Sequence, residues 1–436
     1  MAFITLGSSS KDFSFELNKN PKSGLQAMDL REGALFGFFS KKAKSFNLYF
    51  QDHPLRCSFN EELAERGDLE YNDLTRYSSP LCYLSMLDKG ISIKEPKDTD
   101  APKETHKYTV TLESVRLGSA HLVNLFKKDL QGAYEIEATP LSDESRFFKV
   151  IFSAEASSVY SMLQVVKIFL LLTAKFSDRD QRLDDMQIEK YLKEIVKLDL
   201  NYQLRNVFKV RFLTPNLFRK NRDLINTSSK VNLDLQCDNN FIQRRDFIVN
   251  TAITNYEKAN IVDLGCGEGN YIKILYKKLL ANNGNRKEVF SYHAIDSSAE
   301  ALEDVKHLAR KNEFDLSMYT TLQDFSEKEC SKTDKRYTYV CTEVIEHNTK
   351  EEAEALLDTL DGLRADKIII TTPNKTFNTF YNLEEEETRH HDHKYEVTEE
   401  EFKSLINKCF PEKEVTFYNL GDKVNGIAST LAAVIS

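Results

Sequence analysis

The chain has 436 residues, which is enough for two domains that each bury their own core. Its longest apolar run, residues 165–174, is interrupted by Lys167 and is too short to span a bilayer. Residues 1–10 lack the basic start and apolar centre of a signal peptide. The seven cysteines include no C-x-x-C pair. We therefore expect a reduced, cytoplasmic protein that does not enter a membrane.

The formal net charge of −9 is unevenly divided. Residues 1–235 carry +2 and the remainder carries −11, and an acidic half is a poor general binder of phosphate backbones. Residues 197–230 are locally basic, with eight Lys or Arg against Asp199 and Asp223. This stretch is typical of a solvated helix face and linker, and the alternative is a local track for nucleic acid.

The first half combines strand and helix patterns. Apolar residues at period two predict strands at 13–17, 34–39, 46–50, 108–112 and 147–152. Apolar residues at three-and-four spacing predict helices at about 158–176 and 184–198. Residues 1–235 are therefore predicted to form an α+β domain.

From about Asn239 the chain alternates between strands and helices. The predicted strands are 261–264, 291–295, 337–342 and 367–372, and the predicted helices are 271–280, 299–311 and 350–363. This order indicates an α/β fold with a parallel sheet in residues 236–436. Ligands of such sheets bind outside the carboxyl ends of the strands.

A glycine-rich loop, Gly265-Cys-Gly267-Glu-Gly269, follows the first of these strands and opens a helix. Glycines allow a ligand to approach the backbone closely. The dinucleotide fingerprint would need a third glycine at position 270, where this chain has Asn270. The loop therefore predicts a site for a nucleoside cofactor and departs from the dinucleotide fingerprint, and Asp296 ends the next strand on the same edge.

Carboxylates and imidazoles cluster in the connection after the strand 337–342. Glu343, Glu346 and His347 have i, i+3, i+4 spacing, which places side chains on one face of a helical turn. A capping box at Thr349 and Glu352 predicts that the long helix begins only after them.

A second polar segment, residues 375–392, has the length of a functional loop and leads to His393. We expect a histidine there to fold back over the sheet edge towards Glu343. Two carboxylates and two imidazoles leave two positions of an octahedron free, favour Mn²⁺ over Mg²⁺, and would suit a vicinal diol.

Four motifs in this order carry a family resemblance: Asp263-Leu-Gly-Cys-Gly, Glu343-Val-Ile-Glu-His, Thr371-Thr-Pro-Asn and Arg389-His-His-Asp-His-Lys-Tyr-Glu. The first resembles the cofactor loop of class I S-adenosylmethionine methyltransferases, which have a Rossmann-like parallel sheet. Together they resemble the 3'-terminal RNA ribose 2'-O-methyltransferases of the Hua-enhancer family, over residues 236–436. Residues 17–21 and 30–33 more loosely resemble the amino-terminal domain of bacterial members.

The resemblance implies roles for individual residues. It implies that Glu343, Glu346, His347 and His393 hold a divalent metal ion, Mn²⁺ or Mg²⁺, and form the catalytic centre. His390 and His391 do not match the family ligand. It also implies an RNA phosphate near Arg244. The implied contacts to S-adenosylmethionine are Asp263, Gly265, Gly267, Asp296, Ser297 and Thr321. The chain departs from the family at Val397, where the family usually has Trp, and at Thr320-Thr321, where it has Gly-Ser.

The implied reaction is methyl transfer to the 2'-hydroxyl at an RNA 3' end, which would mark repaired RNA ends. A catechol-like small diol is the alternative substrate. For residues 1–235 the resemblance implies docking to a polynucleotide kinase–phosphatase–ligase repair partner. A substrate-positioning domain is the alternative.

Overall fold

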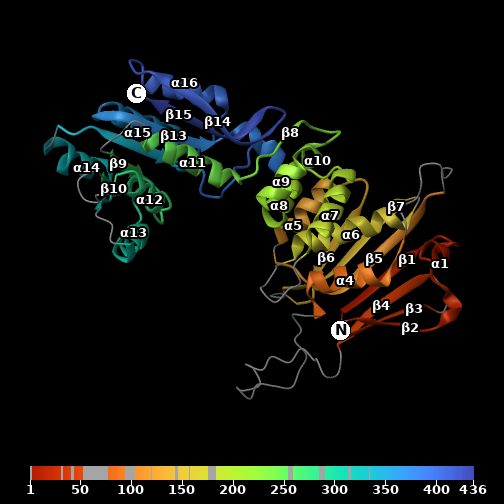
Figure 1. Cartoon of the computed structure of the whole chain (residues 1–436). Helices are drawn as coiled ribbons and strands as arrows, with labels where there is room; N and C mark the ends of the chain where they lie inside the picture. The colour runs from red at the N-terminus through yellow and green to blue at the C-terminus, as the bar shows by residue number, and fades with distance from the viewer. Residues whose placement is uncertain are drawn as a thin grey trace. The chain divides into compact units, whose positions relative to one another are not determined.

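The computed structural model describes residues 2–30, 33–40, 44–52, 77–93, 104–118, 120–142, 146–156, 158–174, 183–253, 259–283, 290–312, 316–332 and 334–436. The chain separates into two compact units, Met1–Leu217 and Phe218–Ser436 (Figure 1). Within the described residues, none of the helices has both the length and the apolar character needed to cross a membrane.

The first unit is built on an antiparallel sheet with the strand order β2-β3-β4-β1-β5-β7-β6. Alternate residues of β1 and β3 are buried, as expected for strands with one face on a core. The strands are β1 (Ala2–Ser8), β2 (Gln26–Leu30), β3 (Gly33–Phe39), β4 (Ser45–Asp52), β5 (His106–Arg116), β6 (Glu135–Pro140) and β7 (Phe147–Ala156).

A buried helix, α6 (Val159–Thr173), packs on β5 and β7 of this sheet. Its N-cap, Ser158, accepts a hydrogen bond from the Tyr160 backbone N–H, so the helix begins where the sequence predicted. The other helices are α1 (Phe13–Glu16), η1 (Pro21–Ser23), α4 (Pro80–Gly90), α5 (Ala120–Asp129), α7 (Asp185–Lys197), α8 (Tyr202–Phe212) and α9 (Pro215–Lys220).

The predicted strand at residues 13–17 is wrong, because this segment forms α1. Phe13 and Leu17 are buried, whereas Phe15 is 87% exposed, so the apolar contacts recur at i and i+4. Asn18 then takes a positive φ of 52° after the turn. The alternation of apolar and polar residues over these five positions was therefore a misleading signal for a strand.

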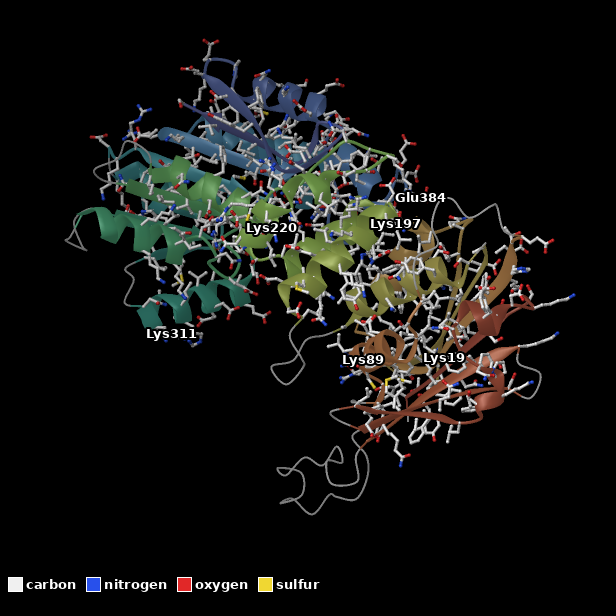
Figure 2. All side chains as sticks on the ribbon, turned by 45° about the vertical axis from the view of Figure 1, so that its right-hand side comes forward. Lys19, Lys89, Lys197, Lys220, Lys311 and Glu384 are labelled. Atoms are coloured by element: carbon white, nitrogen blue, oxygen red, sulfur yellow. The ribbon has the colours of Figure 1, made fainter. Side chains whose placement is uncertain are left out.

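The basic stretch 197–230 is partly internal. Figure 2 labels Lys197, the last residue of α7, and Lys220, the last residue of α9. Between them, Arg205 and Lys209 are 0% and 2% exposed, and Arg205 pairs with Asp199 at 2.9 Å. Cations used inside the fold cannot contact a nucleic acid, so these observations disfavour a continuous basic track.

The second unit contains a sheet with the order β11-β10-β9-β12-β13-β15-β14-β8, in which the neighbours from β11 to β13 are parallel. Its strands are β8 (Leu233–Asp234), β9 (Ala259–Leu264), β10 (Phe290–Ile295), β11 (Ser317–Tyr319), β12 (Tyr337–Thr342), β13 (Ala365–Pro373), β14 (Val415–Val424) and β15 (Ile427–Ile435). Strand β8 comes from residues that the sequence assigned to the first half, and it pairs with β14.

Helices cover both faces of this sheet (Figure 1). One face is covered by α11 (Asn240–Ile253), α12 (Ile272–Asn283) and α13 (Ala299–Asn312). The other is covered by α14 (Leu322–Lys328), α15 (Lys350–Asp361) and α16 (Glu399–Cys409). The remaining elements are α10 (Arg222–Asn226), η2 (Cys330–Lys332), η3 (Ile345–His347) and η4 (Lys375–Tyr381). The segment 375–392, expected to be a loop, thus begins with the short helix η4.

The strand order reverses between β9 and β12, which run side by side but lead away to opposite ends of the sheet. A parallel sheet opens a crevice at such a point, outside the carboxyl ends of the strands. The glycine loop follows β9 and Glu343 follows β12, so both predicted motifs lie at this crevice.

Candidate active site

The glycine loop after β9 lies tightly against the segment that follows β12. Gly265 has a φ of +65°, and a Cβ atom added there would lie 2.6 Å from Cγ2 of Val344. Its backbone N–H donates to the Ile295 carbonyl at 2.8 Å. Only glycine satisfies both the conformation and the close approach, and this packing joins the predicted cofactor loop to the Glu343 segment.

Asp296 fixes the loop from the end of β10. Its two carboxylate oxygens accept hydrogen bonds from the backbone N–H groups of Gly267 and Ser298, at 2.9 and 2.8 Å. Ser297 is exposed beside it, and Thr321, after β11, accepts from the Asp324 N–H as the N-cap of α14. These predicted cofactor contacts therefore follow neighbouring strands along one edge of the sheet.

Asp263, also predicted to contact the cofactor, lies at the base of the loop and is 1% exposed. Burial raises the pKa of its carboxyl to about 7, a shift that the hydrogen bond from the Tyr292 hydroxyl opposes. Asp263 therefore supports the loop from inside the sheet.

The connection after β12 presents the predicted carboxylates. Glu343 has a φ of +54°, a conformation that non-glycine residues rarely adopt, and η3 follows it immediately. Threonines of β13 hold both carboxylates: Thr371 donates to Glu343 at 3.1 Å and Thr372 donates to Glu346 at 3.2 Å. The Thr371-Thr372 pair is thus part of the site.

Backbone hydrogen bonds bring His393 to this connection. The N–H groups of Lys394 and Tyr395 both donate to the Glu346 carbonyl, at 2.7 and 3.1 Å. The rings of His347 and His393 consequently lie 4.9 Å apart, nearly perpendicular to each other. Two segments separated by about fifty residues of sequence meet here, as the sequence predicted.

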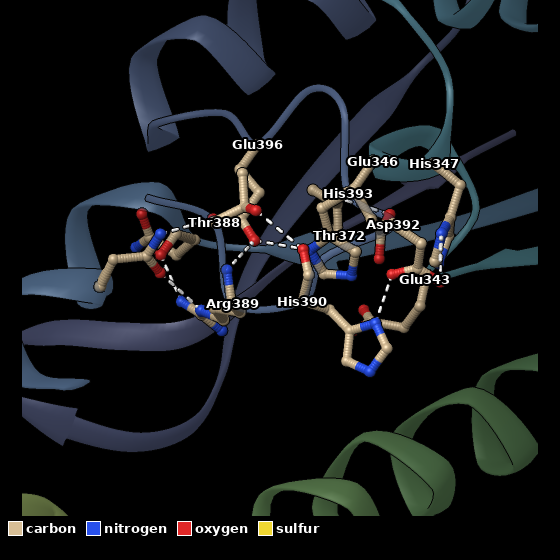
Figure 3. Close-up of polar contacts among 12 residues, drawn as sticks. Glu343, Glu346, His347, Thr372, Thr388, Arg389, His390, Asp392, His393 and Glu396 are labelled. Atoms are coloured by element: carbon tan, nitrogen blue, oxygen red, sulfur yellow. Dashed lines mark hydrogen bonds and ion pairs between the residues drawn. The ribbon is translucent and has the colours of Figure 1, made fainter. Parts of the chain in front are cut away.

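Among the described residues, Glu346, His347 and His393 offer ligand atoms that all lie within 4.8 Å of one another. Figure 3 shows these side chains facing a common space, with Glu343 beside them. Oε1 of Glu346 is buried without a hydrogen-bond partner among those residues. An unpartnered buried carboxylate oxygen facing two imidazoles fits a divalent cation.

Glu343, the fourth predicted ligand, is engaged elsewhere. Its Oε2 lies 2.6 Å from Nη1 of Arg244, on α11. Burial raises the pKa of Glu346 well above its ordinary value, and the nearby charge of Glu343 raises it further. The site therefore brings two carboxyl groups close together, and Arg244 places a positive charge beside Glu343.

A set of residues that the sequence reading did not assign supports His393 from behind. Its Nδ1 lies 2.5 Å from Oε1 of Glu396, whose side chain is 1% exposed. Donation of Nδ1–H to this carboxylate leaves Nε2 free to act as a ligand. Burial disfavours the charged form of Glu396, but hydrogen bonds from His393, Asn378 and the Arg389 N–H outweigh it and lower the pKa of Glu396. The i, i+3 spacing of His393 and Glu396 was the feature of the sequence that could have indicated this contact.

Arg389 anchors the same segment. Its guanidinium donates to Oδ1 of Asn378 at 2.6 Å and to the Ser429 carbonyl at 2.7 Å, and it also contacts the Asn374 carbonyl. These bonds fix the path of the chain just before the histidine-rich stretch.

His390, His391 and Asp392 form a second group of closely spaced ligand atoms among the described residues, and all three are exposed. Nδ1 of His390 contacts Asp392, and the other oxygen of Asp392 lies 3.4 Å from Nδ1 of His347. This group therefore borders the first one on its solvent side.

Comparison with known proteins identifies the family. A profile of the Hen1 N-terminal domain matches residues 3–230, which is more than half of the chain. The chain belongs to the Hen1 family. A profile described as a methyltransferase domain matches residues 255–413.

Individual proteins are also similar to this chain. A Caenorhabditis elegans protein described as a small RNA 2'-O-methyltransferase is 26% identical over 193 residues, which are 40% of this chain and 43% of that protein. The chain therefore matches less than half of the length of this relative. Two solved chains match over the whole chain: one from a Pnkp1/Rnl/Hen1 RNA repair complex (24% identity, 100% of both chains, TM-score 0.75) and one from a Pnkp1/Rnl/Hen1 complex (25% identity, 99% of that chain, TM-score 0.73).

These matches confirm the predicted fold class and family resemblance. The second unit has the class I S-adenosylmethionine methyltransferase fold, and this fold supports S-adenosylmethionine binding by the unit. The individual cofactor, metal and RNA residues stay predictions.

Proposed function

We propose that this Hen1-family chain transfers a methyl group from S-adenosylmethionine to the 2'-oxygen of a 3'-terminal ribose of RNA. The observation that carries the proposal is the convergence of Glu346, His347 and His393 at the strand-order reversal, beside the glycine loop. The C. elegans relative supports RNA as the substrate class.

The residues that would hold a divalent ion are Glu346, His347 and His393, joined by Glu343 once it leaves Arg244. Their two imidazoles favour Mn²⁺ over Mg²⁺. When bound, such an ion would lower the pKa of a ribose hydroxyl and make its oxygen a better nucleophile.

The protein's own contribution is alignment, because the sulfonium of the cofactor is already a good leaving group. Gly265, packed on Val344, keeps the predicted cofactor loop next to the catalytic segment. Glu396 orients the His393 ring, and Thr371 and Thr372 orient the two carboxylates. Three of the four proposed ligands, Glu343, Glu346 and His393, are thus held by a second group behind them.

Radiolabelled methyl transfer to short RNA oligonucleotides tests this function. An RNA with a 2',3'-diol end should accept methyl groups, whereas a 3'-phosphate or 2'-deoxy end should not. A catechol offered in competition covers the small-diol alternative. Comparable transfer to a 2'-deoxy end, or a preference for the catechol, would refute the assignment.

We further propose that residues 1–235 dock a repair partner of the polynucleotide kinase–phosphatase–ligase kind. The two solved relatives from complexes with Pnkp1 and Rnl support this, since they match the chain from end to end. The full chain should retain such a partner in a pull-down, and residues 1–235 should retain it too. Retention by the full chain alone would assign the contact to residues 236–436 instead.

A further inference from the structure

Arg244 holds a carboxylate that the proposed function requires for a metal ion. Nη1 of Arg244 lies 2.6 Å from Oε2 of Glu343, while Oε1 of Glu343 accepts from Thr371 at 3.1 Å. Both oxygens of Glu343 are therefore occupied. This explains why the compact ligand group contains Glu346 and the two imidazoles but omits Glu343.

The Arg244 side chain is itself poorly solvated. It is 17% exposed, and it is hydrogen-bonded to Tyr271, a buried residue just before α12. Its Nε is buried without a hydrogen-bond partner among the described residues. A buried guanidinium with one unused donor depends strongly on the anion beside it.

Charge balance makes Arg244 a substitute for the ion. The site brings the carboxylates of Glu343 and Glu346 together, and Arg244 is the cation in direct contact with Glu343. A divalent ion bound to the same carboxylates would lie near the guanidinium and repel it. Arg244 and the ion therefore compete for Glu343.

We propose that Arg244 is a positioning residue that exchanges partners: it holds Glu343 before an ion binds, and then turns to a phosphate near the RNA 3' end. The inference rests on the proposed function, because it takes the ion and the RNA end from there. A released guanidinium beside a new cation needs another anion, and an RNA backbone offers one within the same substrate. Binding of the ion and binding of the RNA phosphate are thereby coupled.

Two consequences distinguish this exchange from a merely structural ion pair. Without RNA, the wild-type chain should bind Mn²⁺ less tightly than a variant that lacks the guanidinium, because the competitor is gone. A structural pair predicts the opposite, since loss of Arg244 would leave Glu343 poorly placed. In addition, Mn²⁺ should strengthen RNA binding even for an RNA that cannot chelate the ion.

The experiment uses the full chain as wild type, Arg244→Gln, Arg244→Lys and the control Arg245→Gln. Arg245 is the neighbouring residue of the same helix and pairs with Asp246 at 2.9 Å, so its loss removes the same charge without touching Glu343. Electron paramagnetic resonance measures free Mn²⁺, and fluorescence anisotropy measures binding of an RNA whose 3' nucleotide lacks both hydroxyls.

We expect Arg244→Gln to bind Mn²⁺ at least about fivefold more tightly than wild type and Arg245→Gln, the lower end of typical coupling between sites. Mn²⁺ should raise the affinity of wild type for the dideoxy RNA by a similar factor and leave that of Arg244→Gln unchanged. Arg244→Lys keeps the positive charge but loses the two-pronged guanidinium, so its Mn²⁺ and RNA affinities should lie between those of wild type and Arg244→Gln. An intermediate result would also show that a folded variant at this position changes the coupling.

Unchanged or weaker Mn²⁺ binding by Arg244→Gln, in a chain that still methylates diol-ended RNA, overturns the exchange and leaves the proposed function intact. Equal tightening by Arg245→Gln overturns it as well, because net charge would then explain the effect. Absence of Mn²⁺ binding by every protein, wild type included, overturns both the exchange and the metal centre.

Discussion

Two neighbouring histidine clusters in this chain offer the same kinds of ligand but differ in what lies behind them. Glu346, His347 and His393 come from two segments joined by backbone hydrogen bonds, and Thr372 and Glu396 hold them from the protein side. In contrast, His390, His391 and Asp392 are consecutive and exposed. The comparison teaches that ligand types alone do not define a catalytic centre, because supporting groups and partial burial distinguish the two clusters.

Replacing one histidine of each cluster by alanine should give the largest difference in methyl-transfer rate. His393→Ala should lower methyl transfer at least about a hundredfold, because it removes a group used by the reaction itself, while S-adenosylmethionine binding survives. The matched change His391→Ala should lower the rate less than about threefold. Single-turnover assays and calorimetry with the cofactor measure both effects. Equal losses from the two variants would break the distinction between the clusters.

The support behind His393 can be removed without touching a ligand. Glu396→Gln keeps the size of the side chain but loses the negative charge that faces Nδ1 of His393. Mn²⁺ affinity should fall about 10- to 100-fold, the usual range for such supporting groups. Glu400→Gln, an exposed carboxylate in the first turn of α16, serves as the control and should change the affinity far less. An unaltered affinity in Glu396→Gln would mean that His393 is held by other contacts.

His293 is a histidine that is buried but belongs to neither cluster. His293 on β10 is 6% exposed among Tyr319, Phe325 and Tyr337, and its Nδ1 has no partner among the described residues. Burial lowers its pKa from 6.5 to about 4. The folded state thus binds this proton only at a lower pH than the unfolded state does. The free energy of unfolding should therefore fall as the pH drops from about 6.5 towards 4.

His293→Phe should remove this pH dependence, which amounts to at most about 3 kcal/mol for a shift of that size. Urea unfolding at pH 5 and pH 7.5, compared between wild type and variant, measures the difference. An identical loss of stability in both proteins would assign the acid sensitivity to other groups. His391→Phe, the exposed counterpart, should have almost no effect.

The sequence predicted most of what local pattern and capping determine. The capping boxes at Thr349 with Glu352 and at Thr398 with Glu401 are both present, and β12 spans the predicted residues 337–342. These features depend on neighbours in the chain, so a linear pattern contains them. The sequence also predicted that His393 folds back over the sheet edge towards Glu343, since both motifs end at that edge; the structure places His393 beside the neighbouring Glu346 and leaves Glu343 outside the compact group.

The features that the sequence did not predict depend on contacts between distant residues. The ion pair of Arg244 with Glu343 joins α11 to the end of β12, and no spacing rule connects them. Val397, which stands where the family usually has Trp, is fully buried and pairs with Asn374, so a smaller side chain fills that position within this core. The wrong strand prediction at residues 13–17 has the same cause. A short apolar run does not determine which surface it will pack against, and therefore does not decide between a strand and a helix.

The central claim is that Glu346, His347 and His393 act together on one divalent ion during methyl transfer to an RNA end. Its most direct test is radiolabelled methyl transfer to a diol-ended RNA oligonucleotide by metal-stripped protein, with a chelator and then with added Mn²⁺. We predict no methyl transfer in the presence of the chelator and full recovery of transfer when Mn²⁺ is added. The His393→Ala variant should show no such recovery. Undiminished transfer in the presence of the chelator would contradict the account.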